Sequence, residues 1–431
     1  MKTAAFHTLG CKVNQYDTQA ILELFRAAGY TVVPFDGNAD VYVLNTCTVT
    51  GTGDKKSLQL LRRLHREHPE SSIIACGCLA QRLGDRLLET GARLVIGTQH
   101  RLQAVELLER SLAEGHPICA VNELAEGTPF EQLTIRDQED HSRAILKIQE
   151  GCCNRCAYCI IPSVRGPIRS RALPDLLAEA NRLAEAGFRE VVMTGIHLTS
   201  YGRDLKDGTK LIDAIEAVAA IPGIERIRLG SLEPNVADRE FARRMRDCGK
   251  VCPQFHLALQ SGSDSVLRRM RRQYNTAMYR RDVATLREFF PMAAFTTDVM
   301  TGFPGETEEE FAETCGFIRE IGYARIHVFP YSRREGTEAD KMPGQIPKAV
   351  KEERTAKLIA IGKETAAAYE AMWLGKETEI LPEEKTEDGW TGYTPEYIHV
   401  TLPDCPRLQK GEPVKIRLTG STRDGMTGEI L

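Results

Sequence analysis

The chain has 431 residues, of which 42% are hydrophobic and 27% charged, and its formal net charge is −4. This composition is typical of a folded globular protein, and the length favours two or three domains over a single core. No apolar run approaches the ~20 residues that span a bilayer. The N-terminal residues MKTAAFHTLGCKVNQYDT lack a signal-peptide pattern. We therefore expect a cytoplasmic protein without membrane association.

The mildly negative charge gives no overall indication of nucleic-acid binding, which usually accompanies a basic excess. Local basic clusters nevertheless occur at residues 55–56, 62–66, 268–272 and 333–334. Each cluster fits either a solvated helix face or a contact surface for phosphate, and composition does not decide between the two.

The first 115 residues alternate between short apolar runs and amphipathic stretches. Strands are expected at 3–8, 41–45, 72–76 and 93–96, and helices at 14–28, 51–68 and 81–89. This alternation predicts a parallel, flavodoxin-like α/β domain, whose ligands bind beyond the carboxyl ends of the strands. Cys11, Cys47 and Cys78 each follow a predicted strand, so we expect three thiols in one crevice. Cys76 lies within an apolar run and is expected to pack inside its strand.

Residues 116–142 are irregular and acidic and are interpreted as a linker. A second βα series follows in a domain expected to cover residues 143–372. Its predicted strands are 144–149, 190–194, 226–229, 255–259, 294–299 and 326–329, and its helices include 174–186, 211–220, 265–270 and 308–321. Six βα units favour an incomplete (β/α)6 barrel over the closed eightfold barrel, with its chemistry at the C-terminal ends of the strands.

A charged helix at 348–373 precedes a change of pattern. Residues 373–431 contain short alternating runs at 379–381, 397–402 and 414–418, separated by Gly, Pro and Asp. This pattern predicts a small C-terminal β barrel.

The strongest chemical signal is the motif GCCNRCAYC at residues 151–159, which spaces Cys152, Cys156 and Cys159. Thirteen cysteines without an export signal do not indicate a disulfide framework. Thiolates are the ligands of iron–sulfur clusters, and three of them leave the fourth iron open to chelate amino and carboxylate groups. Cys156 and Cys159 alone would also fit a redox pair or half of a zinc site, but no second pair completes one. Cys153 is off this spacing and is interpreted as a bystander.

This spacing resembles that of the radical S-adenosylmethionine superfamily, and the surrounding motifs are most similar to those of its methylthiotransferases. The motifs are TLGCKVN (8–14), NTC (45–47), GCLAQ (77–81), EGC with CIIP (150–162), RG with RSR (165–171), LQSGS (259–263), GFPGET (302–307) and FPYS (329–332). The resemblance covers almost the entire chain, and the last ~60 residues resemble the RNA-binding TRAM domain. Cys153 departs from the family, which usually has a polar residue there.

The resemblance implies two [4Fe–4S] clusters. One, held by Cys152, Cys156 and Cys159, would bind and reductively cleave S-adenosylmethionine. The resulting radical would abstract hydrogen from carbon 2 of an adenine. The auxiliary cluster, held by Cys11, Cys47 and Cys78, would supply a methylated sulfur.

Four further residues at predicted strand ends are candidate contacts for S-adenosylmethionine. They are Gly195, Glu233, Gln260 and Gly302. Turn or solvated-loop roles remain open for all of them. Arg165, Arg169 and Arg171 either grip RNA phosphate or the cofactor, or form a salt-bridged loop.

The KVN residues after Cys11 are most similar to the subgroup that acts on threonylcarbamoyladenosine beside the tRNA anticodon. Sister subgroups act on isopentenyladenosine in tRNA or on an aspartate of a ribosomal protein, and the mildly acidic C-terminal domain slightly favours the last. A non-catalytic RNA-binding protein with structural clusters is the alternative from another class. The expected partners are tRNA and an electron donor, and the expected oligomeric state is a monomer.

Overall fold

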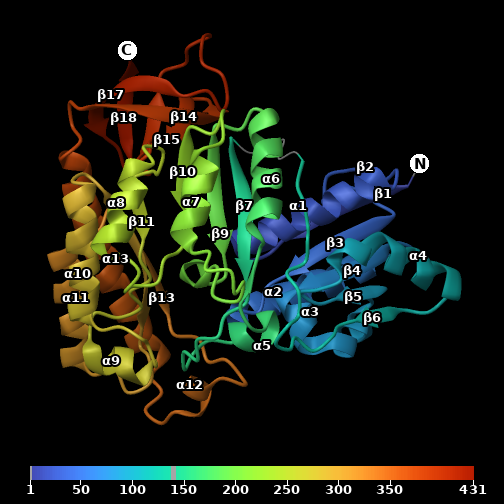
Figure 1. Cartoon of the computed structure of the whole chain (residues 1–431). Helices are drawn as coiled ribbons and strands as arrows, with labels where there is room; N and C mark the ends of the chain where they lie inside the picture. Colours follow the sequence, from blue (N-terminus) through green and yellow to red (C-terminus); the bar gives the residue numbers. More distant parts are fainter. Residues whose placement is uncertain (1, 137–141) are drawn as a thin grey trace.

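The computed structural model describes residues 2–136 and 142–431, so residues 137–141 of the expected linker lie outside the described part of the chain. Figure 1 shows an N-terminal α/β part beside a central barrel-like part, with a small C-terminal barrel at one end of the latter. Within the described ranges, no helix is both long enough and apolar enough to cross a membrane.

The N-terminal part is a six-stranded parallel sheet in the order β2-β1-β3-β4-β5-β6. The strands are β1 (Thr3–Thr8), β2 (Thr31–Val32), β3 (Val41–Thr46), β4 (Ser72–Gly77), β5 (Leu94–Ile96) and β6 (Ile118–Ala120). The helices are α1 (Lys12–Ala27), α2 (Gly51–Glu67), α3 (Cys78–Leu83) and α4 (Ala104–Glu114), with 3-10 turns η1 (Gly84–Thr90) and η2 (Arg101–Gln103). Every residue of β3 is buried, as in parallel sheets that are covered on both faces. The first five strands have the flavodoxin-like order, which confirms the predicted fold.

The segment expected to be irregular from residue 116 begins with a strand. β6 pairs with β5, so the N-terminal sheet extends to Ala120, past the expected boundary at residue 115. A strand of three residues is too short to show an alternating pattern. Further along, Leu133 and Ile135 are buried against Tyr16 of α1 and Ile145, so this connection also packs against both parts that it joins.

The central part has six parallel strands: β7 (Arg143–Glu150), β9 (Glu190–Gly195), β10 (Arg226–Leu229), β11 (Gln254–His256), β12 (Ala294–Thr301) and β13 (Arg325–Pro330). β7, β9 and β10 form one sheet, with the short antiparallel β8 (Arg169–Ser170) at its edge, and β11, β12 and β13 form another. Single bridges, Ile227 to Val251 and Leu232 to Leu257, join the two sheets. The barrel is therefore incomplete, as the count of βα units predicts.

Helices cover the outside of this barrel, and their apolar faces share one large core with the strands. They are α6 (Leu173–Glu185), α7 (Leu211–Ala219), α8 (Arg239–Asp247), α9 (Asp264–Arg269), α10 (Thr276–Phe289), α11 (Glu308–Ile321) and α13 (Lys348–Ala371), with the 3-10 turn η3 (Leu198–Ser200). The short helices α5 (Ile161–Arg165) and α12 (Glu338–Lys341) pack in two smaller apolar clusters. Two of the longer ones, α10 and α13, are at the side of the barrel away from the N-terminal part (Figure 1).

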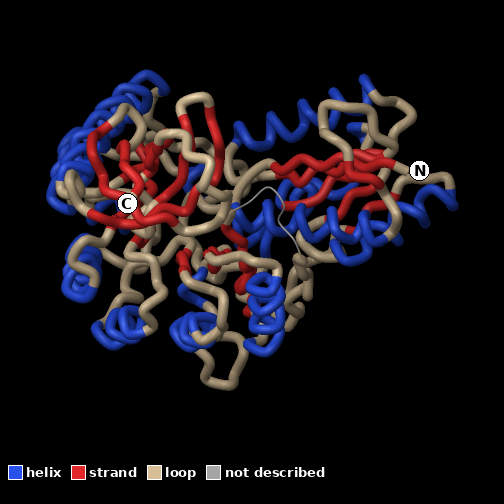
Figure 2. Tube along the Cα trace, turned by 90° about the horizontal axis from the view of Figure 1, so that it is seen from above, coloured by secondary structure: helices blue, strands red, loops and turns tan. Residues whose placement is uncertain are grey.

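The C-terminal part is a closed barrel in the order β14-β15-β16-β18-β17, which confirms the predicted small β barrel. Its strands are β14 (Glu377–Thr386), β15 (Gly389–Tyr393), β16 (His399–Leu402), β17 (Val414–Ser421) and β18 (Met426–Ile430). Its core includes Ile380 and Val400 and continues onto Tyr369 and Trp373 at the end of α13. Figure 2 shows this barrel from above, at the opposite end of the molecule from the N-terminus.

Candidate active site

The N-terminal crevice contains three cysteines at the carboxyl ends of neighbouring strands. Cys11 lies between β1 and α1, Cys47 directly follows β3, and Cys78 follows β4 as the first residue of α3. In the flavodoxin-like order, the gap between β1 and β3 is the switch point, where ligands bind. Cys11 and Cys47 flank this gap, and Cys78 lies at the end of the next strand of the sheet.

Local backbone geometry places these cysteines close together. Gly77 has a φ of +90°, and a Cβ there would lie 2.2 Å from Oδ1 of Asn45. Only glycine allows this close approach of β4 to β3, and it places Cys78 beyond the strand end. Asn14 donates to the carbonyl oxygens of Leu9 (2.7 Å) and Thr46 (3.1 Å) and so ties the loops that carry Cys11 and Cys47.

The Cys78 thiol is buried next to a cation from the other part of the molecule. Burial, together with the neighbouring Cys11 and Cys47, raises the pKa of Cys78 to about 11, although Arg165 opposes the shift. Nε of Arg165 donates to Sγ of Cys78 over 3.1 Å. A buried thiol ligates a metal only as the thiolate, so a bound cation must supply the rest of the stabilising charge. The donor set fits a cluster with soft thiolate ligands.

Cys76 has a different environment, although it is only two residues from Cys78. It is fully buried within β4 and belongs to the hydrophobic core beneath the sheet. Its Sγ contacts the carbonyl oxygen of Leu44 at 3.7 Å. This confirms the prediction that Cys76 packs inside the strand.

The second cysteine loop, residues 151–159, leaves the carboxyl end of β7. Gly151 has a φ of +72°, and a Cβ there would lie 1.9 Å from the Pro167 carbonyl oxygen. The amide of Cys152 then donates to the Gly166 carbonyl oxygen over 3.0 Å. From below, Nε2 of Gln149 donates to the carbonyl oxygens of Glu150 (2.7 Å) and Gly151 (2.8 Å). The first residues of the loop are thus held in place on both sides.

The three spaced cysteines of this loop also lie near one another. Burial raises the pKa of Cys152 to about 11 and that of Cys159 to about 12, and the Cys156 thiol adds to both shifts. The Asn154 amide donates to Sγ of Cys152 (3.4 Å), and Arg272 donates to Sγ of Cys156 (3.1 Å). Within residues 2–136 and 142–431, no three ligating side chains converge on one metal ion. A four-iron cluster has its ligands on separate irons, so its thiolates need not converge in this way.

The two cysteine loops meet across the boundary between the N-terminal and central parts. Cys78 of α3 packs against Ile160 and Val164, which follow Cys159 at the start of α5 and within it. Figure 1 shows α3 and α5 side by side. The carboxyl ends of the two sheets therefore face a common region.

A buried ion network extends this boundary. Asp17 of α1 pairs with Lys147 of β7 (2.7 Å), Arg165 (3.2 Å) and Arg101. Glu150, two residues before Cys152, pairs with Arg165 (2.7 Å) and Lys147. All five side chains are at most 2% exposed. Because the charges come from both parts, the network fixes one part relative to the other.

Of the alternatives for Arg165, Arg169 and Arg171, a grip on RNA phosphate does not fit the burial of these side chains. The three residues are 0%, 2% and 1% exposed, respectively. Arg171 pairs with the buried Glu179, and Arg169 donates to the Arg165 carbonyl oxygen (2.9 Å). For Arg165 and Arg171 the structure supports the salt-bridged alternative, whereas Arg169 is bound only by carbonyl oxygens and its Nε and Nη2 have no hydrogen-bond partner among the described residues.

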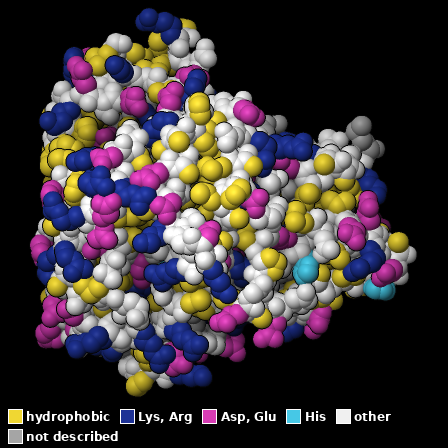
Figure 3. Space-filling model, viewed as in Figure 1, with side chains coloured by type: hydrophobic (Ala, Val, Ile, Leu, Met, Phe, Trp, Pro, Cys, Tyr) yellow, Lys and Arg dark blue, Asp and Glu magenta, His cyan; other side chains and the backbone are white. Residues whose placement is uncertain are grey.

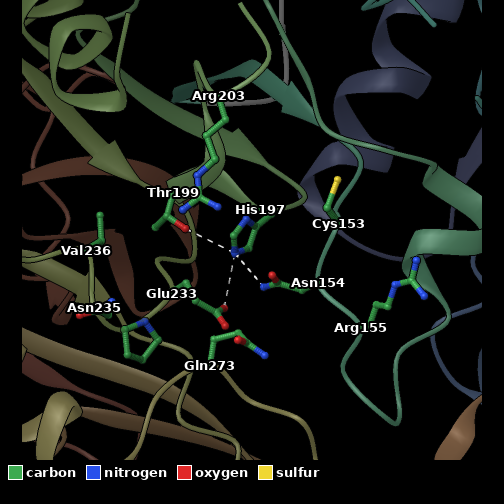
Figure 4. A pocket seen from close by; sticks show the side chains of 11 residues that line it. Cys153, Asn154, Arg155, His197, Thr199, Arg203, Glu233, Asn235, Val236 and Gln273 are labelled. Carbon is green, nitrogen blue, oxygen red and sulfur yellow. Dashed lines mark hydrogen bonds and ion pairs between the residues drawn. The ribbon is translucent and has the colours of Figure 1, made fainter. Parts of the chain in front are cut away.

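A cavity of about 600 Å³ opens beside the loop of residues 151–159, here called the cluster loop (Figure 4). Cys153 and Asn154 line it from the loop, His197 and Thr199 from the segment after β9, and Glu233 from the segment after β10. Nε2 of His197 lies 3.2 Å from Nδ2 of Asn154 and 3.8 Å from the Glu233 carboxylate. Burial, with nearby Arg203 and Arg272, lowers the pKa of His197 to about 4. The volume is in the usual range for a small-molecule site.

Of the four candidate cofactor contacts, Glu233 lines this cavity and pairs with Arg272 over 2.6 Å. Gln260 is nearly buried at the end of the β11 segment, has a φ of +66° and has no hydrogen-bond partner for Oε1 among the described residues. An unpartnered polar atom on a strained backbone favours a ligand contact there. For Gly195 and Gly302 the structure gives packing reasons, since Cβ atoms there would meet Gln149 at 2.8 Å and Lys351 at 2.1 Å, respectively.

Sequence reasoning did not identify His197, Thr199, Arg203 or Arg272 as site residues. The first three follow Gly195, which was selected for its position at a strand end. The rule that ligands gather beyond the carboxyl ends of strands would have included the loop after that glycine. Arg272 was counted in a surface cluster, although it is 5% exposed at the side chain.

Comparisons with known proteins support these observations. Residues 3–97 match the model described as "Uncharacterized protein family UPF0004", and residues 146–318 match the radical SAM superfamily. A threonylcarbamoyladenosine tRNA methylthiotransferase of Bacillus subtilis is 41% identical over 97% of this chain and 94% of its own. The chain belongs to the radical S-adenosylmethionine methylthiotransferase family. It is an enzyme of that family, which sets aside the alternative of a non-catalytic binding protein.

Two further relatives differ in their named substrates. A threonylcarbamoyladenosine tRNA methylthiotransferase of Thermotoga maritima is 34% identical over 92% of this chain and 91% of its own. A tRNA-2-methylthio-N(6)-dimethylallyladenosine synthase of Acetivibrio thermocellus is also 34% identical, over 91% of this chain and 84% of its own.

Among solved structures, the radical S-adenosylmethionine methyltransferase TsrM of Kitasatospora setae is 14% identical, with a TM-score of 0.58 over 79% of this chain and 77% of its own. At this identity the match shows the fold alone. The family itself implies a [4Fe–4S] cluster and S-adenosylmethionine as cofactors.

Proposed function

We propose that this enzyme adds a methylthio group to carbon 2 of threonylcarbamoyladenosine beside the anticodon of tRNA. The observation that carries the proposal is the full-length similarity to the Bacillus subtilis enzyme named for that substrate. The two cysteine crevices, which face a common region, support the same reaction because it needs both a radical and a sulfur donor.

In this proposal Cys152, Cys156 and Cys159 hold the cluster that binds S-adenosylmethionine, and Cys11, Cys47 and Cys78 hold the auxiliary cluster. When bound, these groups would supply the radical and the methylated sulfur. The chain's own part is to hold the two sites. Gly151 and Gln149 shape the loop of residues 151–159. Arg165 links the Cys78 thiol to the carboxylate of Glu150, which directly precedes that loop.

The cavity beside the cluster loop is the proposed place for S-adenosylmethionine and the adenine. Glu233 and Gln260 remain the proposed contacts for S-adenosylmethionine, and Gly195 and Gly302 would shape the backbone around it. The adenine would reach the cavity from the single-stranded anticodon loop, where a base can be turned outward. An electron donor would supply the reducing electron, and the enzyme would work as a monomer in the cytoplasm.

A direct test offers the purified, reconstituted enzyme three acceptors separately, with S-adenosylmethionine, sulfide and a reductant. The acceptors are tRNA with threonylcarbamoyladenosine, tRNA with isopentenyladenosine and the ribosomal protein. We expect methylthiolation of the first alone, detected by mass spectrometry of the nucleosides or peptides. Modification of another acceptor without the first would move the enzyme to a sister subgroup. The dimethylallyladenosine synthase at 34% identity makes isopentenylated tRNA the second candidate.

A further inference from the structure

Two arginines at the cavity beside the cluster loop have no acidic partner among the described residues. Arg155 lies between Cys152 and Cys156, and Arg203 lies shortly after η3. Both side chains are exposed and both line the cavity. Figure 4 shows Arg203 above Thr199 and His197 on the side of β9, and Arg155 across from them on the cluster loop.

The other titratable groups that line this cavity do not neutralise the two arginines. Glu233 already pairs with Arg272 over 2.6 Å. His197, whose pKa is lowered to about 4 by burial, is neutral near pH 7. The cavity therefore has an excess of positive charge at its mouth, and this favours an anionic group on the molecule that it binds.

The backbone on both sides of Arg203 is fixed. The Gly202 amide donates to Oγ of Ser170 over 2.9 Å, and the Ser170 amide donates to Asp204 over 2.8 Å. Gly202 has a φ of +90°, and a Cβ there would lie 1.9 Å from the Thr209 carbonyl oxygen. Asp204 is thus engaged by Ser170, and Arg203 extends from a backbone that needs little ordering on binding.

We propose that Arg203 binds the carboxylate of the threonyl group and thereby selects this substrate over one with an uncharged substituent. This inference rests on the proposed function. The threonylcarbamoyl group ends in a carboxylate, whereas a dimethylallyl group has no charge. The carboxylate of S-adenosylmethionine is expected on the open iron, which leaves the substrate's carboxylate for the arginine. A guanidinium can hold a carboxylate through two parallel hydrogen bonds, with both charge and geometry matched.

The test measures binding of anticodon hairpin RNAs to the cluster-loaded enzyme without reductant. One RNA has threonylcarbamoyladenosine, a second has the same group as its carboxamide, and a third has dimethylallyladenosine. Wild type should bind the first about tenfold more tightly than the second. Arg203→Gln should bring that ratio to about one, and Arg203→Lys should keep part of it. Lys206→Gln, which removes an exposed charge from the same loop outside the cavity, should keep the wild-type ratio.

Two outcomes would overturn the assignment of Arg203. One is an unchanged ratio in Arg203→Gln, and the other is equal weakening of all three RNAs, which would indicate a phosphate contact. Iron content and the cluster absorbance of each variant show that the site is intact. If wild type methylthiolates threonylcarbamoylated RNA while either outcome occurs, only this inference fails. If wild type modifies only the dimethylallyl RNA, the proposed function fails, and this inference fails with it.

Discussion

The chemistry proposed for Cys78 and Cys76 differs because one lies beyond a strand end and the other lies within the strand. Cys78→Ala should remove the auxiliary cluster, so that iron falls from roughly eight to roughly four per chain. The variant should still cleave S-adenosylmethionine under reduction. Cys76→Ala should keep both clusters and lose about 1 kcal/mol of stability, because it removes a buried sulfur from the core.

Iron analysis and quantification of deoxyadenosine measure the two effects. Cys153→Ser is the matched control in the other loop, because its side chain is exposed and off the ligand spacing. It should retain both clusters. A Cys76→Ala protein with half the iron would reverse the assignment of the third auxiliary ligand.

His197 gives the free energy of unfolding a dependence on pH. Burial, with Arg203 and Arg272, lowers its pKa to about 4 in the folded protein, whereas an unfolded histidine titrates near 6.5. Between these values only the unfolded chain binds the proton, so stability is lost as pH falls from about 6.5 to about 4. At pH 5 the loss is about 2 kcal/mol relative to pH 7.

Urea unfolding at pH 7 and pH 5 measures this loss. His197→Gln should reduce the difference between the two pH values by about 2 kcal/mol. His116→Gln, which removes an exposed ring, should behave as wild type. If His197→Gln leaves the pH dependence of unfolding unaltered, His197 is not the group responsible.

At the residue level, sequence reasoning succeeded where position along a strand determines the environment. Cys11, Cys47 and Cys78 were placed from strand ends alone. It left the role of Arg165 open, because its partners Asp17 and Cys78 come from another part of the molecule. An arginine in a charged stretch is usually solvated, and a sequence does not show which distant carboxylates will surround it.

At the scale of single elements, the conformation of the cluster loop depends on Gly151. In Gly151→Ala the new Cβ would meet the Pro167 carbonyl oxygen, and the backbone there has a φ of +72°. The loop must shift, so we expect loss of the cluster held by Cys152, Cys156 and Cys159 and no cleavage of S-adenosylmethionine. Gly249→Ala is the matched control, because its φ is +66° and no atom lies within 4 Å of the new Cβ.

The control variant Gly249→Ala should lose only about 1–2 kcal/mol of unfolding free energy, because alanine is strained in a left-handed backbone, and it should keep all its iron. Iron content and thermal unfolding separate the two effects. Equal iron content in the two variants would mean that the close contact between Gly151 and the Pro167 carbonyl oxygen does not hold the cluster loop in place.

The elements that the sequence predicted well are those with a long repeating pattern. α11 was predicted with the observed bounds at 308–321, and Thr307 caps it by accepting from the Glu310 amide. β2, β6 and β8 have only two or three residues each and were missed. The strand predicted at 255–259 was too long, since β11 ends at His256. The residues that follow make only isolated bridges, Leu257 to Leu232 and Gln260 to Val299.

For the whole molecule, the order of the three parts can be predicted from changes in the hydrophobic pattern along the sequence. The way in which the parts pack against one another cannot. The relevant contacts join residues more than a hundred positions apart, such as Lys147 with Asp17 and Arg334 with Asp54. Folding within the central part also removes charges from the surface. Of the basic cluster at 268–272, Arg269 pairs with Glu310 and Arg272 with Glu233. Figure 3 shows acidic and basic side chains interspersed on the face in view.

The basic residues at the start of α2 are the better candidates for contacts with RNA phosphate. Lys55 and Lys56 are exposed, and α2 begins at Gly51, whose amide lies 3.4 Å from Oγ of Ser332 on the central part. They therefore lie near the region that both crevices face. In a plot of the logarithm of the RNA-binding constant against the logarithm of the salt concentration, each lost phosphate contact reduces the steepness of the slope by about 0.9.

The double variant Lys55→Gln/Lys56→Gln should weaken hairpin binding and reduce the salt slope by about 2. The loss should be equal for threonylcarbamoylated and unmodified hairpins, because phosphate contacts position the RNA without reading its bases. Arg86→Gln/Arg110→Gln, which removes two exposed charges elsewhere in the same part, should leave the slope as in wild type. Binding titrations from low to high salt give the slopes. An unchanged slope in the lysine variant would place the RNA on another surface, while the cavity and its cysteine loops would keep their proposed roles.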